Sequence, residues 1–207
     1  MNILILGEKY RNKNIMEFLS KSNNIFQTED KITLEYLKEN NINFLISNGY
    51  APIIKEPIIS EYKHKIINIH PTFLPYGRGI YPLLWNLLEE TPIGVTLHFI
   101  DKGIDSGEII FQKSVTFDDN NTLEEAYTIL LNEAEKLFYD NWENILTKQY
   151  TLKYQDQLET YRSRDISEKY IDILSECWDT KIKNFKKLSY FYKMNKEFVK
   201  NLNEWRY

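Results

Sequence analysis

Residues 68–71 of the chain, Asn-Ile-His-Pro, combine side chains that could catalyse a reaction. Because side chains alternate across a strand, Asn68 and His70 are expected on one face, about 6–7 Å apart along the chain. An imidazole accepts or donates a proton near neutral pH. An asparagine amide can donate a hydrogen bond to the oxyanion that forms when a carbonyl becomes tetrahedral. The pair therefore favours acyl transfer, and the alternative interpretation is a hydrogen-bonded pair in the core.

A third residue is needed to orient the imidazole or to tune its charge, and the polar loop at 101–107 offers two carboxylates. Gly103 and Gly107 flank Asp105, and glycine allows the tight turn that would aim a carboxylate inward. We expect Asp105 to fill this role, with Asp101 as the alternative.

The elements that must position these residues alternate between strands and helices. Short apolar runs that end at Gly7 or Pro71 are typical of parallel strands buried on both faces. Thr122-Leu-Glu-Glu is a capping box that starts a long helix. This alternation predicts an α/β core with a mainly parallel sheet over residues 1–146. The predicted strands are 3–6, 43–47, 65–70, 94–100 and 108–115, and the predicted helices lie around 15–19, 33–40, 82–88 and 122–146.

Residues 147–207 are expected to form a short mixed α/β C-terminal extension. Residues 149–154 suit an exposed strand and residues 167–178 suit a helix. The final stretch is rich in lysine and has apolar residues at helical spacing. It could touch RNA or a membrane, but an amphipathic helix packed on the domain or on a second subunit requires no further partner. The apolar positions are Ile182, Phe185, Tyr192, Phe198 and Leu202.

Composition excludes several classes of protein. The 207 residues are 43% hydrophobic and 14% aromatic, which argues against wholesale disorder. The net charge of −4 weighs against a nucleic-acid binder. Cys177 is the single cysteine, so the chain cannot form an internal disulfide. The sequence has no run of about 18 uncharged apolar residues that could span a bilayer, and residues 1–7 lack the charged start of a signal peptide. We expect a cytoplasmic protein with no membrane partner.

Other catalytic or binding chemistries lack their motifs. His64, His70 and His98 have no metal-ligand spacing and no cysteine partners, so no metal is expected. The sequence contains no Gly-x-Ser-x-Gly elbow of a serine hydrolase. A non-catalytic dinucleotide-binding module would require a Gly-x-Gly-x-x-Gly turn after the first strand, which is also absent.

Two blocks of sequence resemble the signature of the N10-formyltetrahydrofolate-dependent formyltransferases. Residues 68–75 read Asn-Ile-His-Pro-Thr-Phe-Leu-Pro, and residues 94–109 read Gly-Val-Thr-Leu-His-Phe-Ile-Asp-Lys-Gly-Ile-Asp-Ser-Gly-Glu-Ile. The family pattern is Asn-x-His-Pro-Ser-x-Leu-Pro, then Val-x-x-His and Asp-x-Gly, and Thr72 stands where serine is usual. The resemblance implies a Rossmann-like core, N10-formyltetrahydrofolate as formyl donor, and a catalytic triad of Asn68, His70 and Asp105.

The resemblance also implies a place for the folate and for residues behind the triad. His98 matches a recurrent family histidine and would support the triad together with Thr72, although a satisfied core histidine is equally consistent with its strand. Tyr50 could equally be a packing residue. The residues expected to line the pteridine site are Tyr50, Pro52, Ile53, Ile54, Asp101 and Ile104.

The acceptor amine is inferred from a further resemblance. Residues 74–85 and 161–165 resemble segments of the sugar N-formyltransferases that act on dTDP-linked 3- or 4-amino-dideoxyhexoses, and a strand near 149–154 would match their dimer-forming hairpin. A methionyl-tRNA enzyme would need a larger C-terminal domain and a basic surface. A glycinamide ribonucleotide enzyme would need a Gly-rich turn, whereas residues 7–12 contain one glycine.

The resemblance thus predicts a homodimeric enzyme that formylates a dTDP-linked amino sugar, with dTDP-4-amino-4,6-dideoxyglucose as the favoured acceptor, for O-antigen or other surface glycan synthesis. The alternatives are a dTDP-3-amino sugar, phosphoribosylglycinamide, or a folate- or nucleotide-binding module without activity. Cations would bind the pyrophosphate and aromatic rings would form walls of the acceptor site, although Trp85 also suits a helix core. The expected acceptor-binding residues are Lys9, Tyr76, Arg78, Tyr81 and Trp85.

Overall fold

The structure is a computed structural model that describes residues 1–155, 160–173 and 177–194. A six-stranded sheet with the order β2-β1-β3-β4-β5-β6 forms its centre. β1 pairs in parallel with β2 and β3, and β3 pairs in parallel with β4, whereas β4–β5 and β5–β6 are antiparallel. The predicted α/β class is therefore confirmed. The strands are β1 Asn2–Leu6, β2 Asn24–Thr28, β3 Phe44–Ser47, β4 Ile66–His70, β5 Gly94–Phe99 and β6 Ile109–Ser114.

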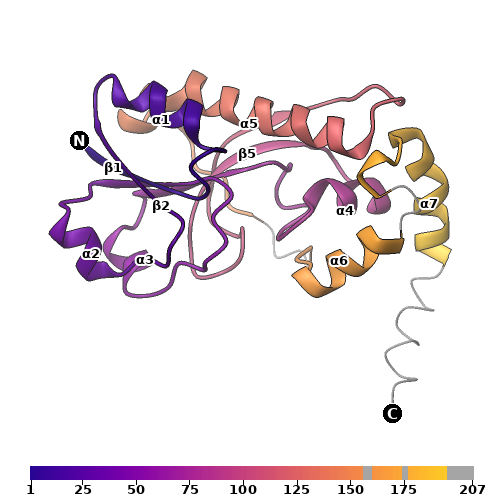
Figure 1. Ribbon diagram of the computed structural model, residues 1–207, viewed down its shortest axis with the longest axis horizontal. Helices are drawn as coiled ribbons and strands as arrows, with labels where there is room; N and C mark the ends of the chain where they lie inside the picture. The colour runs from indigo at the N-terminus through magenta and orange to yellow at the C-terminus, as the bar shows by residue number, and fades with distance from the viewer. Residues whose placement is uncertain (156–159, 174–176, 195–207) are drawn as a thin grey trace, which may run out of the picture.

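Helices cover both faces of the sheet, with α1 and α5 on one side and α2 and α3 on the other (Figure 1). The alternation of β1 explains this arrangement, because Ile3 and Ile5 enter the core under α1 and α5 while Leu4 and Leu6 enter the core under α2 and α3. The helices are α1 Lys13–Ser20, α2 Leu34–Glu39, α3 Ile58–Glu61, α4 Pro82–Glu89, α5 Leu123–Leu146, α6 Arg164–Ile173 and α7 Ile182–Met194, with a 3₁₀ turn at Cys177–Asp179.

Two elements of the core were not predicted from sequence. β2 is an edge strand whose residues are half-buried or exposed, so it lacks the apolar run that marks the central strands. α3 is a single turn of four residues, too short to show a helical period.

The C-terminal segment is helical and packs on the core. Residues 149–155 make only an isolated antiparallel bridge, between Lys153 and Ile109, in place of the predicted strand. α6 starts before the predicted helix, and α7 lies against α4 with Ile182 and Phe185 buried. Phe198 and Leu202 lie outside the described residues. None of the helices in the described part of the chain is both long and apolar enough to cross a membrane.

Candidate active site

Asn68 and His70 come from the carboxyl end of β4. The strand alternates as expected: Ile67 and Ile69 pack into the core beneath α5, which leaves Asn68 and His70 on the opposite face. Asn68 is opposite Ser47 on the parallel neighbour β3 and opposite His98 on the antiparallel neighbour β5. Ligands of open α/β sheets collect at this edge, beyond the carboxyl ends of parallel strands.

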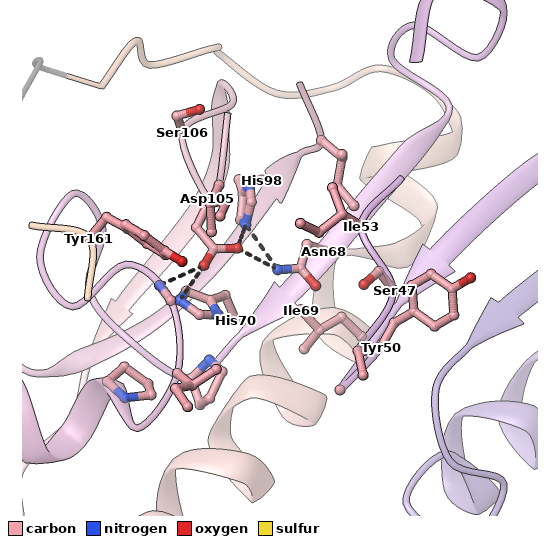
Figure 2. A pocket seen from close by; sticks show the side chains of 18 of the residues that line it. Ser47, Tyr50, Ile53, Asn68, Ile69, His70, His98, Asp105, Ser106 and Tyr161 are labelled. Atoms are coloured by element: carbon pink, nitrogen blue, oxygen red, sulfur yellow. Dashed lines mark hydrogen bonds and ion pairs between the residues drawn. The ribbon is translucent and has the colours of Figure 1, made fainter. Parts of the chain in front are cut away.

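Asp105 joins this pair from the loop between β5 and β6. Its carboxylate Oδ1 accepts a hydrogen bond from Asn68 Nδ2 at 3.3 Å, and its Oδ2 lies 3.5 Å from His70 Nε2. The backbone N–H of Gly79 donates to Oδ2 at 2.9 Å. Figure 2 shows Asn68, His70 and His98 all directed toward this carboxylate. An amide, an imidazole and a carboxylate therefore converge at one point.

The loop turns at Asp105 itself rather than at the flanking glycines. Asp105 has φ 50°, the left-handed region that aspartate tolerates better than most residues. Gly103 and Gly107 serve close approach instead, because a Cβ at Gly107 would lie 1.9 Å from the carbonyl oxygen of Phe99. The other carboxylate, Asp101, accepts from the N–H of Gly103 and from the Ser106 hydroxyl and so closes the loop. It does not reach the imidazole.

The Asp105 carboxyl is held ionised. Burial alone would raise its pKa, but the nearby His70 and His98, the Gly79 N–H and Arg78 together hold the pKa below its ordinary value. The side chain is 15% exposed, so these contacts act with little screening by water. Asp105 is therefore a hydrogen-bond acceptor at neutral pH.

His98 is buried and neutral. Burial lowers its pKa to about 4, against the attraction of Asp105. Its Nδ1 donates to the carbonyl of Phe99 at 2.8 Å, which leaves Nε2 as an acceptor facing Asn68 Nδ2 at 3.2 Å. The Asn68 amide nitrogen thus lies between two acceptors, Asp105 Oδ1 and His98 Nε2, and this arrangement fixes the orientation of the amide.

His70 has unused hydrogen-bonding capacity. Its Nε2 is buried and, within the described part of the chain, makes no hydrogen bond, although Asp105 lies close enough for an ion pair. Buried polar atoms are nearly always satisfied, so this nitrogen is suited to a hydrogen bond with a group that enters the cavity. The imidazole is thus available to donate a hydrogen bond or to transfer a proton.

These residues open into a cavity of about 540 Å³. Tyr50 lines it, but its hydroxyl donates to the carbonyl of Asp30 at 2.7 Å and so also fastens the loop after β2. Ile53 is 60% exposed and Ile104 is 38% exposed, and their aliphatic side chains suit a flat heterocycle. All the residues expected to line a pteridine site border this cavity: Tyr50, Pro52, Ile53, Ile54, Asp101 and Ile104.

Of the residues expected to bind an acceptor, the structure brings only Tyr81 to the cavity. The expectation that Trp85 forms a wall is corrected, because its side chain is 1% exposed and its indole donates to the Ser167 hydroxyl at 2.9 Å. The other three residues do not border the cavity, contrary to the expectation that they bind the acceptor. They are Lys9, Tyr76 and Arg78.

Thr72 lies in the turn after β4 and is fully buried. Its hydroxyl is 2.8 Å from Asn86 Oδ1 and 3.1 Å from the carbonyl of Tyr76. These contacts shape the backbone of the turn that follows His70. Thr72 therefore acts on the structure of the turn, and its side chain does not border the cavity.

Three arginines that the sequence interpretation did not select border the cavity. Arg11 lies over Gly49, where its guanidinium donates to Asn48 Oδ1 at 3.3 Å. Arg162 stacks on the Trp85 ring at 5.4 Å, and Arg164 starts α6. Arg162 and Arg164 belong to the segment noted by resemblance, whereas no signal in the sequence marks Arg11, because the contact joins residues 37 apart.

Metal ligands do not gather around the cavity or elsewhere in the described residues, where no group of three or more His, Cys, Asp or Glu side chains could hold a metal ion. The chemistry that the site offers is that of hydrogen-bond donors, a proton-transferring imidazole and a fixed carboxylate.

Comparison with known proteins gives a consistent result. A family model described as formyl transferase matches residues 7–141. The formyltransferase PseJ from Anoxybacillus kamchatkensis, solved in complex with UDP-4,6-dideoxy-4-formamido-L-AltNAc and tetrahydrofolate, is 37% identical with a TM-score of 0.83, and the match covers 89% of this chain and 97% of that chain. An N-formyltransferase from Helicobacter canadensis in complex with folinic acid and dTDP-3-aminofucose is 25% identical with a TM-score of 0.63, covering 79% and 71%.

Curated relatives match over a shorter region. A methionyl-tRNA formyltransferase from Clostridium perfringens is 30% identical over 129 residues, which is 62% of this chain and 42% of that protein. The chain therefore spans about half the length of the curated relatives it matches.

Proposed function

Because the chain belongs to the formyltransferase family, we propose that it is an enzyme that transfers the formyl group of N10-formyltetrahydrofolate to the amine of a nucleotide-linked amino-dideoxyhexose. The observation that carries the proposal is the likeness to the A. kamchatkensis sugar-nucleotide enzyme, because it covers 97% of that chain and therefore includes the segment after the core. The match to a methionyl-tRNA enzyme covers only 42% of that protein.

In the proposed mechanism, the sugar amine attacks the formyl carbon as the free base. His70 donates from its unsatisfied Nε2 to the oxygen that becomes negative, and Asn68 donates one amide N–H to the same oxygen in place of its 3.3 Å bond to Asp105. Asp105 stabilises the protonated imidazole. His70, or a water held by Asp105, moves the proton from the new ammonium to the departing N10 nitrogen, which yields the formamide and tetrahydrofolate.

We propose that the acceptor amine is on C4 of the sugar. The relative with 37% identity was solved with a 4-formamido sugar, which agrees with the sequence-based preference for a 4-amino-4,6-dideoxyhexose. The same relative carries its sugar on UDP, whereas the sequence resemblance favoured dTDP. UDP is therefore the favoured carrier and dTDP the second. In either case Arg11, Arg162 and Arg164 are the cavity cations that would face the diphosphate.

The experiment is a panel of acceptors incubated with N10-formyltetrahydrofolate and followed by mass spectrometry. The panel contains UDP- and dTDP-linked 4-amino sugars, a dTDP-linked 3-amino sugar, and phosphoribosylglycinamide. The proposal expects the mass gain of one formyl group on a 4-amino nucleotide sugar. Formylation of phosphoribosylglycinamide alone would contradict it, and folate binding with no product from any acceptor would favour a binding module.

We also propose that the enzyme works as a homodimer and that its product enters a surface glycan such as an O-antigen. The sequence resemblance to dimer-forming sugar N-formyltransferases supports the first statement, and the amino-sugar acceptor supports the second. Light scattering of the purified protein tests the dimer, and a monomeric mass at micromolar concentration would exclude it.

A further inference from the structure

The loop that carries Asp105 is fastened from outside the cavity by Gln155. The Gln155 side-chain amide donates to the backbone carbonyl of Asp105 at 3.0 Å and to that of Gly107 at 2.7 Å. Its oxygen accepts from Arg78 Nε at 3.3 Å and Nη2 at 2.9 Å. The two donors and the acceptor of the amide each meet a complementary partner, so only one orientation of the Gln155 amide fits.

Arg78, which donates to the Gln155 oxygen, directly precedes Gly79 in the sequence, and Gly79 binds the Asp105 carboxylate. Gly79 donates its N–H to Asp105 Oδ2, and the loop at Gly79 is itself paired with residue 162, whose N–H donates to the carbonyl of Arg78. Asp105 is thus held at its backbone carbonyl by Gln155 and at its carboxylate by Gly79. The contact between Gln155 and Arg78 joins these two supports.

Apart from these two supports and the other contacts of the Asp105 carboxylate, the side-chain contact among the described residues that attaches this loop to another segment is an exposed ion pair between Lys102 and Glu56 at 3.3 Å, and exposed ion pairs contribute little. Residues 101–104 are exposed, and Asp105 has the left-handed φ of 50°. A conformation of this kind persists when the surrounding contacts over-determine it. The hydrogen bonds of Asp101 close the loop on itself but do not attach it to the rest of the molecule.

Gln155 borders the neighbouring cavity on the far side of the loop and is not among the residues that line the substrate cavity. Any effect on the reaction must therefore pass through the residues that Gln155 holds, which are those of the Asp105 loop and Arg78. Gln155 also lies beyond residues 7–141, the part matched by the family model.

We propose that Gln155 is a positioning residue for formyl transfer, which sets the catalytic carboxylate of Asp105 by fastening its loop to Arg78. The inference rests on the proposed function, since it assumes that Asp105 acts in catalysis. A displacement of about 1 Å can cost on the order of 100-fold in rate, so loss of the contact is expected to lower kcat rather than substrate binding.

Three variants test this. Gln155→Leu removes all the contacts, Gln155→Glu keeps an acceptor for Arg78 but cannot donate to the two carbonyls, and Lys153→Gln is the control at an exposed position of the same segment. For both Gln155 variants kcat should fall about 10- to 100-fold, with KM for donor and acceptor changed by less than about threefold. Lys153→Gln should match the parent. Parent-like kcat in both Gln155 variants, or a rise in KM alone, would overturn the proposal.

A double-mutant cycle separates positioning from general damage to the fold. In an Asp105→Asn background, Gln155→Leu should lower the residual kcat by less than about threefold, because the carboxylate through which Gln155 is proposed to act is already absent. A further loss as large as in the parent would overturn the inference. If Asp105→Asn is fully active, the proposed site fails; if it is impaired while Gln155→Leu is not, only the inference fails.

Hydrogen exchange supplies a readout that does not depend on activity. Gln155→Leu should speed the exchange of backbone amides at 102–107 while the amides of the central strands keep their protection. Equal exchange in the loop of the variant and the parent would show that Gln155 does not restrain it.

Discussion

At the scale of single residues, the site is a set of mutually constrained hydrogen-bonding groups. Asn68 lies between Asp105 and His98, so its amide orientation is fixed, whereas the His70 Nε2 is left for a ligand. Charge is concentrated on Asp105, which is ionised, while His98 is neutral because burial opposes its protonation. Such separation of protonation states is what acid–base chemistry at neutral pH requires.

Replacement of His70 by asparagine, or of Asp105 by asparagine, should lower kcat by about 10²- to 10⁴-fold, the range typical of a lost general acid–base group. Each change preserves approximate size, so the protein should remain folded. Asp140→Asn, at an exposed position on α5, is the control for loss of a carboxylate elsewhere. Steady-state kinetics and circular dichroism provide the measurements, and near-parental turnover in either site variant would refute the assignment.

Stability should fall on acidification because of His98. Its pKa is about 4 when folded and 6.5 ordinarily, so between these pH values the unfolded chain binds more protons and stability decreases as the pH falls. The shift corresponds to roughly 3 kcal/mol over that window. Asp105, whose folded pKa is also lowered, adds a further loss at lower pH.

Urea denaturation at several pH values would measure this dependence. The variant His98→Gln should show a flatter slope between pH 6.5 and 4, because its side chain cannot bind a proton. If the variant retains the slope of the parent, the acid sensitivity has another origin.

At the scale of elements, strand ends and helix caps position the site. β4 brings Asn68 and His70 to the carboxyl edge of the sheet, and the β5–β6 loop returns Asp105 to the same point. α5 covers the opposite face of these strands and begins at a complete capping box. Its first turn also touches the C-terminal segment, since Leu123 N–H donates to the carbonyl of Thr180.

The capping box should contribute measurably to stability. The Thr122 hydroxyl accepts from the N–H of Glu125 at 3.1 Å, and Thr122→Ala should lower the free energy of unfolding by about 1 kcal/mol. Thr122→Ser keeps the acceptor and should lie close to the parent. Denaturant titration would measure the free energy of unfolding of each variant. Equal stability of the alanine variant and the parent would contradict the role of the cap.

At the scale of the whole molecule, the segment after α5 shares the main core. Phe185 on α7 is 2% exposed, and Ile171 and Ile182 belong to the same cluster as the residues of β1 and α5. Trp85 of α4 is enclosed by Tyr170 and Tyr192 from α6 and α7. Because Arg162 stacks on the same indole, the core packing of α4 also fixes one arginine that lines the cavity.

This shared core predicts cooperative unfolding. Phe185→Ala should cost about 3–5 kcal/mol, and the loss should appear in a single transition. Lys187→Ala, on the exposed side of α7, should change stability by less than about 0.5 kcal/mol. Coincident transitions by tryptophan fluorescence and far-UV circular dichroism are expected; an early separate transition, or a loss below 1 kcal/mol, would mean that α7 is not part of the core.

Local pattern in the sequence determined the parts of this protein that depend on near neighbours. The apolar runs identified five of the six strands, β2 being the exception, and the alternation of β4 placed Asn68 and His70 on one face. The cap of α5 follows from residues three apart. β2 was not predicted, because an edge strand that is half-buried or exposed does not need an apolar run.

Tertiary structure alone decided what depends on distant contacts. Asp105 rather than Asp101 faces the imidazole, and the backbone N–H of Gly79 donates a hydrogen bond that holds the Asp105 carboxylate there. Trp85 is part of the core because helices far along the chain enclose it. Arg11 and Gln155 reach their partners over long separations in sequence. Local sequence patterns cannot predict such contacts, because their hydrogen bonds form between residues that are far apart in the sequence and meet only in the folded protein.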